Sequence, residues 1–280
     1  MKKKTVINST LFYVLITAFG LFMIYPLLWM LTSSFKPGNE IFKGVSFLPK
    51  TWTTDNYVVG WQGISGYGFG HFLANSFFIV IMAMIGNVLS CTLTAYSFSK
   101  LQYKGRGLWF TLMMGSMMLP IHARLIPQYI VYNQIGWVNT YFPMIVPKFL
   151  ATEGFFVFMM TQYMRGLPHE IDEAARIDGC SYFQHYLRIV IPMSVPTIIT
   201  ACIFTFIWTW NDFFTQMIYL SKISTFTVSI ALRQYVDAMG ESYWGAMFAM
   251  SIVSLLPLFV MFIGFQRYLI EGVTAGSIKG

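Results

Sequence analysis

Charged residues are scarce in this sequence. Asp, Glu, Lys and Arg make up only 10% of its 280 residues, against roughly 25% in an ordinary soluble domain. Hydrophobic residues account for 56% of the chain, and the mean hydropathy is +0.60. This composition excludes an ordinary soluble protein and indicates a membrane protein.

Cysteine is also scarce, and the common catalytic motifs are absent. The three cysteines, Cys91, Cys180 and Cys202, are an odd number without CxxC or Cys/His spacing, so neither a disulfide framework nor a metal site is predicted. No GxxxxGK[ST], HExxH or GxSxG pattern occurs, and no pair of catalytic carboxylates stands out. We therefore expect that the chain is not an enzyme, holds no cofactor and does not bind ATP itself.

Long apolar runs, by contrast, are abundant. Six segments can cross the roughly 30 Å hydrocarbon core as helices of about 20 residues; they cover residues 11–31, 73–98, 108–130, 143–164, 196–220 and 244–265. Prolines interrupt the third and fourth segments and predict kinks there. The first run is too long for a signal peptide, so it is expected to be an uncleaved span. The sequence thus predicts an all-α, polytopic protein of the cell membrane with six transmembrane helices.

Basic residues are placed unevenly between the connections. With the N-terminus inside, eleven Lys and Arg residues fall in inner segments and five in outer ones, so the positive-inside rule places both termini in the cytoplasm. We interpret the basic excess as membrane topology and expect no nucleic-acid partner. The predicted division is a first helix with an extracytoplasmic loop (1–71), a five-helix core (72–266) with a cytoplasmic loop at 165–192, and a cytoplasmic tail (267–280).

The loop between the fourth and fifth predicted spans carries an unusually polar stretch, "EAARIDGCSYFQHYLRIVIP", at residues 173–192. Pro168 suits a first helical position, and the acidic residues after it favour the positive end of a helix dipole. Asp178 and Gly179 predict the end of this helix, because glycine accepts a left-handed conformation.

A second helix is predicted directly after this turn. Ser181 and Gln184 have the spacing of a capping box, and we expect the helix to run to Ile191, before Pro192. The pattern therefore predicts a helix, a tight turn and another helix. Local physics alone also fits an ordinary cytoplasmic connection with a solvated charged face.

Polar residues inside predicted spans are functional hypotheses, because placing them in lipid is costly. Asn211 and Asp212 lie beside Trp208 and Trp210 in the fifth span. Amide and carboxylate groups suit sugar hydroxyls, and an indole suits the apolar face of a pyranose ring. Glu153, in the middle of the fourth span, is a further candidate for the substrate path. Alternatively, these groups hold helices together, with the tryptophans forming an interfacial belt.

Three further charged or titratable residues lie in the third and fourth spans. Lys148 precedes Glu153 by five residues, which places the two on different faces of a continuous helix. We therefore expect Lys148 to extend outward to the membrane interface. His122 and Arg124, in the proline-broken third span, are weaker candidates for pore or receptor contacts.

The spacing within residues 173–192 resembles the EAA loop of type I ATP-binding-cassette (ABC) import permeases, EAA-x3-G-x9-I-x-L-P, at six fixed identities. Cys180 replaces the usual alanine and Ile191 the usual leucine. Four other segments resemble the carbohydrate-importing branch of this family, similar to the maltose permease G subunit. These segments are "YPLLWMLTSSFKP" at 25–37, the stretch from "NSFFIV" to "AYSFSKLQYKGR" at 75–106, "WNDF" at 210–213 and the tail "GVTAGSIKG" at 272–280.

The resemblance implies a type I ABC importer permease fold and a non-catalytic pore subunit that moves a sugar or oligosaccharide into the cytoplasm. It implies a second permease subunit in a heterodimer, two ATP-binding subunits that use ATP and magnesium, and an extracytoplasmic solute-binding protein. The residues that it assigns to the ATPase contact are Glu173, Ala174, Ala175, Asp178 and Gly179.

Two alternatives remain open from the sequence. One is a permease of the same architecture for another solute, such as a sugar phosphate, a polyol or an amino acid. The other is an ion-coupled carrier, which would need no coupling loop and no ATPase.

Overall fold

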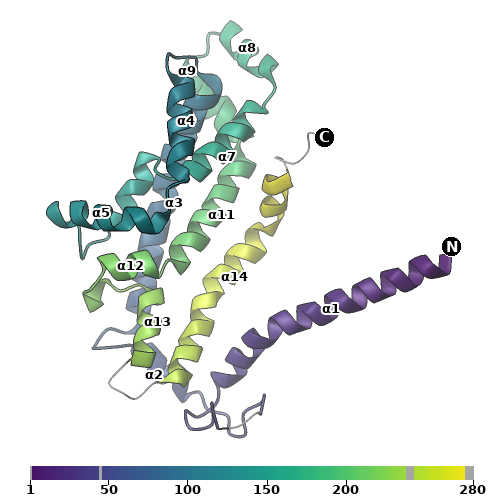
Figure 1. Cartoon of the computed structure of the whole chain (residues 1–280), viewed down its shortest axis with the longest axis vertical. Helices are drawn as coiled ribbons and strands as arrows, with labels where there is room; N and C mark the ends of the chain where they lie inside the picture. The colour runs from purple at the N-terminus through teal and green to yellow at the C-terminus, as the bar shows by residue number, and fades with distance from the viewer. Residues whose placement is uncertain (1, 44–45, 238–242, 275–280) are drawn as a thin grey trace. The chain divides into compact units, whose positions relative to one another are not determined.

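The computed structural model describes residues 2–43, 46–237 and 243–274, and within them the regular structure is helical, without a named strand (Figure 1). This confirms the all-α prediction. The α-helices are α1 Lys2–Ser33, α2 Asp55–Gln62, α3 Phe69–Lys100, α4 Arg106–Met117, α5 Ile121–Gln134, α6 Phe142–Ile145, α7 Gly154–Arg165, α8 His169–Ile177, α9 Tyr182–His185, α10 Ile191–Met193, α11 Val195–Asn211, α12 Phe214–Tyr219, α13 Val228–Asp237 and α14 Trp244–Thr274. Three short helical segments are not α-helical: the 3₁₀ helices η1 Val146–Leu150 and η3 Ile223–Thr225, and the π-helix η2 Tyr186–Val190.

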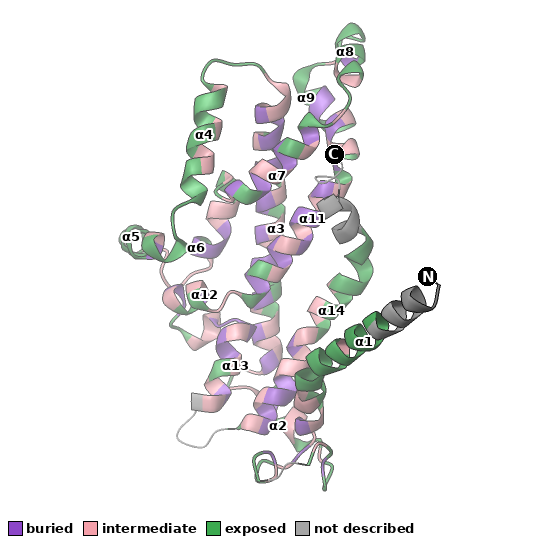
Figure 2. Ribbon diagram, turned by 45° about the vertical axis from the view of Figure 1, so that its right-hand side comes forward, coloured by how far each residue is buried: buried purple, intermediate pink, exposed green. Residues whose placement is uncertain are grey.

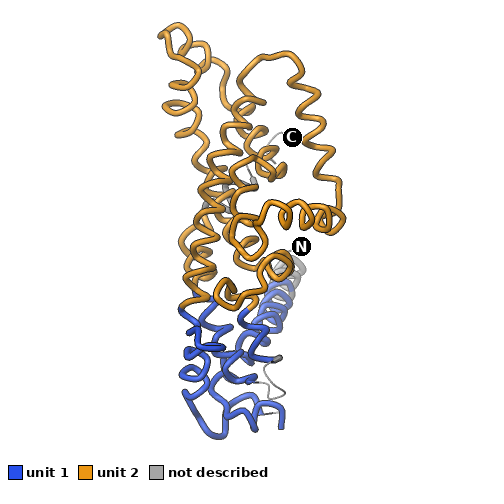
Figure 3. The backbone as a smooth tube through the Cα atoms, turned by 90° about the vertical axis from the view of Figure 1, so that its left-hand side faces the viewer, with its two compact units in different colours: residues 1–70, 231–256 blue, residues 71–230, 257–280 orange. Residues whose placement is uncertain are grey.

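The chain divides into two compact units (Figure 3). Unit 1 comprises residues 1–70 and 231–256, and unit 2 comprises residues 71–230 and 257–280. Because α14 runs to Thr274, the tail predicted from residue 267 begins inside this helix. The last six residues of the "GVTAGSIKG" segment lie outside the described residues.

Unit 1 holds an ordered segment after α1. The Ser34 hydroxyl lies 2.9 Å from the Tyr57 hydroxyl, and the Asn56 amide donates to the carbonyl oxygens of Ser34 and Lys36 at 2.8 and 2.7 Å. The Tyr235 hydroxyl donates to the carbonyl of Gly60. In contrast, the apolar side chains of α1 from residue 12 to 28 are mostly exposed (Figure 2), as in a helix surrounded by lipid or by another membrane protein.

Within the described residues, four helical segments are long and apolar enough to cross a membrane, and a bent pair would make a fifth. The four are Phe12–Ser33, Phe69–Lys100, Phe142–Arg165 and Trp244–Arg267, which agree with the first, second, fourth and sixth predicted spans. The bent pair, Tyr182–Met193 with Val195–Asn211, turns by 75°. Six spans and the cytoplasmic placement of both termini therefore stay predictions.

The third predicted span, 108–130, is wrong as a single helix. Pro120 has φ −57° and ψ 133° and separates α4 from α5, because a proline cannot donate the helical hydrogen bond and its ring hinders the preceding turn. α5 lies crosswise to α4 (Figures 1 and 2). At 12 and 14 residues, the two helices extend only about 18 and 21 Å.

The fourth predicted span contains the predicted kink, and the fifth is broken. In the fourth, α6 passes into η1, and Ala151 in the left-handed region, at φ 53°, precedes α7. In the fifth, α11 ends at Asn211, and the extended Asp212 precedes the short α12. The prediction of a continuous helix over 196–220 is therefore wrong, and both breaks expose backbone and polar side chains within apolar segments.

An apolar core in unit 2 is built around α3 and α7 (Figure 2). Its fully buried members include Phe156, Val157, Met160 and Met164, which recur on one face of α7 at helical spacing. α7 contacts α4 on one side and α11 on another. This packing makes α7 a rigid connection between the break near residue 151 and the polar stretch that follows residue 165.

Candidate functional site

The polar stretch forms the predicted helix, turn and helix, and we call residues 168–185 the elbow. α8 begins at His169 with Pro168 as its N-cap, one residue later than predicted. It ends in a Schellman motif: the Gly179 N–H donates to Arg176 O at 3.1 Å, and the Cys180 N–H donates to Ala175 O at 2.9 Å. Gly179 has φ +70°, so the predicted role of this glycine is confirmed.

The predicted capping box is also present. The Gln184 N–H donates to Ser181 Oγ at 3.3 Å, and the Ser181 N–H donates to Gln184 Oε1 at 3.0 Å. The helical path continues beyond the predicted end, through η2 and α10 to Met193, so the stop before Pro192 is wrong.

Side chains tie the elbow to the end of α3. Lys100 Nζ donates to Asp172 Oδ2 at 2.8 Å, and His185 Nε2 lies 3.1 Å from Asp172 Oδ1. The Tyr96 hydroxyl donates to Tyr182 O at 3.0 Å and lies 3.0 Å from His185 Nδ1. One carboxylate on α8 is thus joined to α3 and to α9, which holds the two arms of the elbow together.

The five residues assigned to the ATPase contact do not share one surface. Glu173, Ala174, Asp178 and Gly179 are exposed, whereas Ala175 is buried and faces inward. Large apolar side chains beside them are exposed as well, namely Ile177, Tyr182 and Phe183. Exposed apolar groups next to charged ones are typical of a surface that another protein covers.

A cavity of about 570 Å³ in unit 2 brings together most of the predicted substrate-path residues. Its wall comes from α5, α6, η1, α11 and α12, and it includes Glu153, Trp208, Asn211 and Asp212. Trp210 does not line it. That side chain is buried, stacked on Phe206 at a ring-centroid distance of 5.5 Å and packed edge-on against Phe77 at 4.9 Å.

The break before α7 pairs two charges in this cavity. Lys148 Nζ lies 2.5 Å from Glu153 Oε1, so the prediction that Lys148 extends outward without this partner is wrong. The spacing argument assumed a continuous helix, but η1 and the left-handed Ala151 turn the chain back between the two residues. Glu153 is the N-cap residue of α7 and not the middle of a helix.

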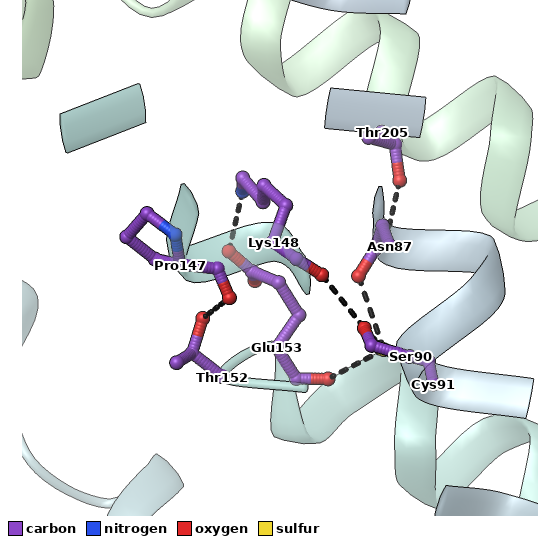
Figure 4. Close-up of polar contacts among 8 residues, drawn as sticks. All are labelled: Asn87, Ser90, Cys91, Pro147, Lys148, Thr152, Glu153 and Thr205. Atoms are coloured by element: carbon purple, nitrogen blue, oxygen red, sulfur yellow. Dashed lines mark hydrogen bonds and ion pairs between the residues drawn. The ribbon is translucent and has the colours of Figure 1, made fainter. Parts of the chain in front are cut away.

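Polar side chains of α3 hold this break in place (Figure 4). Ser90 Oγ donates to the carbonyl oxygen of Lys148 at 2.6 Å, and Asn87 Nδ2 donates to Thr205 Oγ1 of α11 at 2.7 Å. Cys91 Sγ donates to Asn87 Oδ1 at 3.0 Å. The sequence interpretation missed this network, although Asn87, Ser90 and Cys91 follow i, i+3, i+4 spacing within an apolar helix, a pattern that places them on one face.

α5 contributes a second cation to the cavity. Arg124 lines it, whereas His122, the other weak candidate, packs edge-on against Phe214 at a ring-centroid distance of 5.3 Å. The charged residues in the cavity wall are two bases, Arg124 and Lys148, and two acids, Glu153 and Asp212. Their formal charges balance, so the cavity is polar and carries no net formal charge.

Comparison with known proteins explains why these two sites occur in one chain. Residues 6–274 match the family described as the inner membrane component of binding-protein-dependent transport systems. The chain belongs to that family. Its members are membrane components of transport systems, which confirms the prediction that the chain is a transport protein and not an enzyme.

Relatives in this family match the chain over nearly its full length. It is 32% identical over 280 residues to the probable ABC transporter permease protein YurM of Bacillus subtilis (strain 168), covering 100% of this chain and 91% of the relative. It is 31% identical to the arabinooligosaccharides transport system permease protein AraQ of Halalkalibacterium halodurans, with 100% of both covered. It is 30% identical to the trehalose/maltose transport system permease protein MalG of Thermococcus litoralis, with 92% of each covered.

A solved structure shares the fold. A chain of a bacterial ABC transporter involved in the import of the acidic polysaccharide alginate superposes with a TM-score of 0.84 at 21% identity, covering 94% of this chain and 96% of that chain. The predicted type I ABC permease fold is therefore confirmed.

Proposed function

We propose that this family member is the permease subunit of an ATP-driven importer that moves an uncharged sugar or oligosaccharide into the cytoplasm. The observation that carries the proposal is the cavity at the broken helices. It presents the Trp208 indole beside the Asn211 amide and two carboxylates, with no net formal charge. An indole face with amide and carboxylate partners suits a pyranose ring and its hydroxyls. The relatives named for arabinooligosaccharide and trehalose/maltose transport support this substrate class.

The structure of the elbow is consistent with a partner subunit that supplies the energy for transport. Its exposed face, formed by Glu173, Ala174, Asp178 and Gly179 with Ile177, is the proposed contact for an ATP-binding subunit. In this proposal the complex contains a second permease, two ATP-binding subunits and an extracytoplasmic solute-binding protein. ATP and magnesium act on the ATP-binding subunits. The permease has six spans in the cell membrane, with both termini in the cytoplasm.

The proposed mechanism is a shift between inward-open and outward-open arrangements. A ligand shifts such an equilibrium only through its different affinities for the two states, and a change from 1:99 to 99:1 needs about 5.5 kcal/mol. ATP binding at the partner supplies this difference. The elbow transmits it because α8 is closed at its C-terminus by the Schellman motif and joined by Asp172 to α3 and α9.

Reconstitution of the complete transporter tests this function. We expect labelled neutral oligosaccharide to enter proteoliposomes only when ATP and the solute-binding protein are both present. The same vesicles should reject sugar phosphates and amino acids. Uptake by this chain alone, without ATP, would identify an ion-coupled carrier and overturn the proposal. ATP-dependent uptake of another solute would retain the importer and reject the sugar.

Asn211→Leu tests the cavity itself. This substitution keeps the approximate size of the side chain but removes an amide that we place against a sugar hydroxyl. Loss of one such hydrogen bond, about 1 kcal/mol, should lower the rate of sugar uptake about fivefold at saturating binding protein. Asn133→Leu is the matched control, because Asn133 is exposed on α5 and does not line the cavity. Equal uptake by both variants would remove Asn211 from the substrate path.

A further inference from the structure

A second cavity, of about 900 Å³, lies behind the elbow. Its wall comes from the ends of α3 and α7, from α8, and from α9 with the turn before it. The basic residues around it are Lys100, Arg165, His169, Arg176 and His185, whereas Asp172 is the one acid among its lining residues. The charge of this cavity is therefore unlike that of the balanced cavity at the broken helices.

The carboxylate of Asp172 is already paired with basic side chains. Both oxygens of Asp172 face basic groups, since Oδ2 accepts from Lys100 Nζ at 2.8 Å and Oδ1 lies 3.1 Å from His185 Nε2. The two arginines in the wall thus have no carboxylate among the lining residues to neutralise them. An anion that enters the cavity would meet two guanidinium groups from two different helices.

Arg165 is held in place by its neighbours, whereas Arg176 is exposed. Arg165 donates one N–H to Phe98 O at 3.3 Å, and its guanidinium lies 5.0 Å from the centroid of the Phe110 ring. This contact fixes the group and uses one of its five N–H donors. Arg176 is exposed on α8. Guanidinium groups recognise phosphate through paired hydrogen bonds and keep their charge at every physiological pH.

The position of the cavity favours a lipid headgroup as the source of a phosphate that could bind there. Lys100 is the last residue of α3 and Arg165 is the last residue of α7, and both helices belong to segments that are long and apolar enough to cross a membrane. Basic pockets at the ends of such helices lie at the depth of lipid headgroups. The volume of about 900 Å³ also exceeds what an inorganic phosphate ion needs.

We propose that this cavity binds the phosphate group of an anionic phospholipid between Arg165 and Arg176. The bound headgroup would contact α8 on the face that carries Ala175, which adjoins the exposed face proposed for the ATP-binding subunit at Gly179. The lipid would therefore support the elbow from behind. This inference needs the membrane location of the family but not the identity of the transported solute.

Native mass spectrometry of the intact, detergent-purified transporter tests the proposal. The probes are phosphatidylglycerol, which is anionic, and phosphatidylcholine, which carries a phosphate but no net charge. We expect phosphatidylglycerol to be retained in preference to phosphatidylcholine. Arg176→Gln should weaken its retention about fivefold, the factor expected for one basic group at a membrane surface. Arg165→Gln should also weaken the retention of phosphatidylglycerol.

Arg188→Gln is the matched control, because Arg188 is an exposed arginine on η2 outside this cavity. It should leave lipid retention unchanged. If it weakened retention as much as Arg176→Gln does, the lipid would be responding to general surface charge, and the proposed site would be wrong. The proposal would also be overturned if the transporter retained phosphatidylglycerol no better than phosphatidylcholine. That result would be expected if a side chain of the ATP-binding subunit fills the cavity.

A competition arm separates the two sources of phosphate. Inorganic phosphate added at increasing concentration should not displace phosphatidylglycerol if the lipid tail and headgroup both contribute. Displacement that is lost in Arg176→Gln would keep the phosphate site and assign it to a free anion in place of a lipid.

Discussion

Gly179→Asp should leave the chain folded and abolish coupled transport. No atom lies within 4 Å of a Cβ built at Gly179, so the chain itself has room for a side chain there. The φ of +70° favours glycine, but aspartate adopts the left-handed region more readily than most residues. Gly179 borders both the cavity behind the elbow and its exposed face, and the exposed side is where we place the ATP-binding subunit. An unpaired carboxylate buried in that interface costs about 3 kcal/mol, or about a hundredfold in the assembly equilibrium.

Two measurements separate docking from folding in this variant. The melting temperature of the purified permease should change little, whereas the ATP-binding subunit should no longer co-purify with it. Gly179→Asn is the matched control, because asparagine has nearly the same shape, tolerates the same φ and carries no charge. It should retain more assembly than Gly179→Asp. Normal assembly and normal uptake by the Asp variant would make the coupling role of this turn untenable.

The elbow was predictable because its determinants are local. Ser181 and Gln184 are three residues apart, and Gly179 closes a helix through hydrogen bonds to residues within the same turn. Such contacts depend on a few neighbouring residues and survive in almost any tertiary setting. The inward position of Ala175 was not predictable, because it depends on how α8 is rotated against the end of α3.

The cavity was only partly predictable, because its shape depends on breaks in helices. The polarity of Asn211, Asp212 and Glu153 marked them as functional candidates, and all three line it. The ion pair from Lys148 required the turn at Ala151, where a residue other than glycine adopts a left-handed conformation. Alanine gives no sequence signal for such a turn. Hydrogen bonds from α3, distant in sequence, accompany it (Figure 4).

The two sites in unit 2 are joined by one rigid element. α7 begins directly after Glu153 in the cavity wall and ends at Arg165, four residues before α8 begins. Its 12 residues extend about 18 Å, and its apolar face is buried in the core. A close-packed helix transmits displacement because interiors are dense and incompressible. A movement of the elbow would therefore reach the Lys148–Glu153 pair through α7.

Asp172→Asn should separate the elbow from α3 and strongly reduce coupled uptake. The side chain of Lys100 is 7% exposed and that of Asp172 is 13% exposed, so the ammonium group would be left in a largely buried position without a carboxylate. Removing one partner of such a pair costs about 3 kcal/mol. We expect a lower melting temperature for the permease and fewer sugar molecules imported per ATP hydrolysed. Both quantities can be measured in the reconstituted transporter.

The control for this variant lies on the same helix. Glu170→Gln removes the same charge from the first turn of α8, but Glu170 is exposed, so its loss should cost at most a few tenths of a kcal/mol through the helix dipole.

A double variant, Lys100→Met with Asp172→Leu, should recover much of the stability, because apolar replacement of a buried pair is often neutral. If it recovers stability but not coupling, the charges of the pair contribute to transmission. If Asp172→Asn behaves like Glu170→Gln, the elbow does not depend on its link to α3.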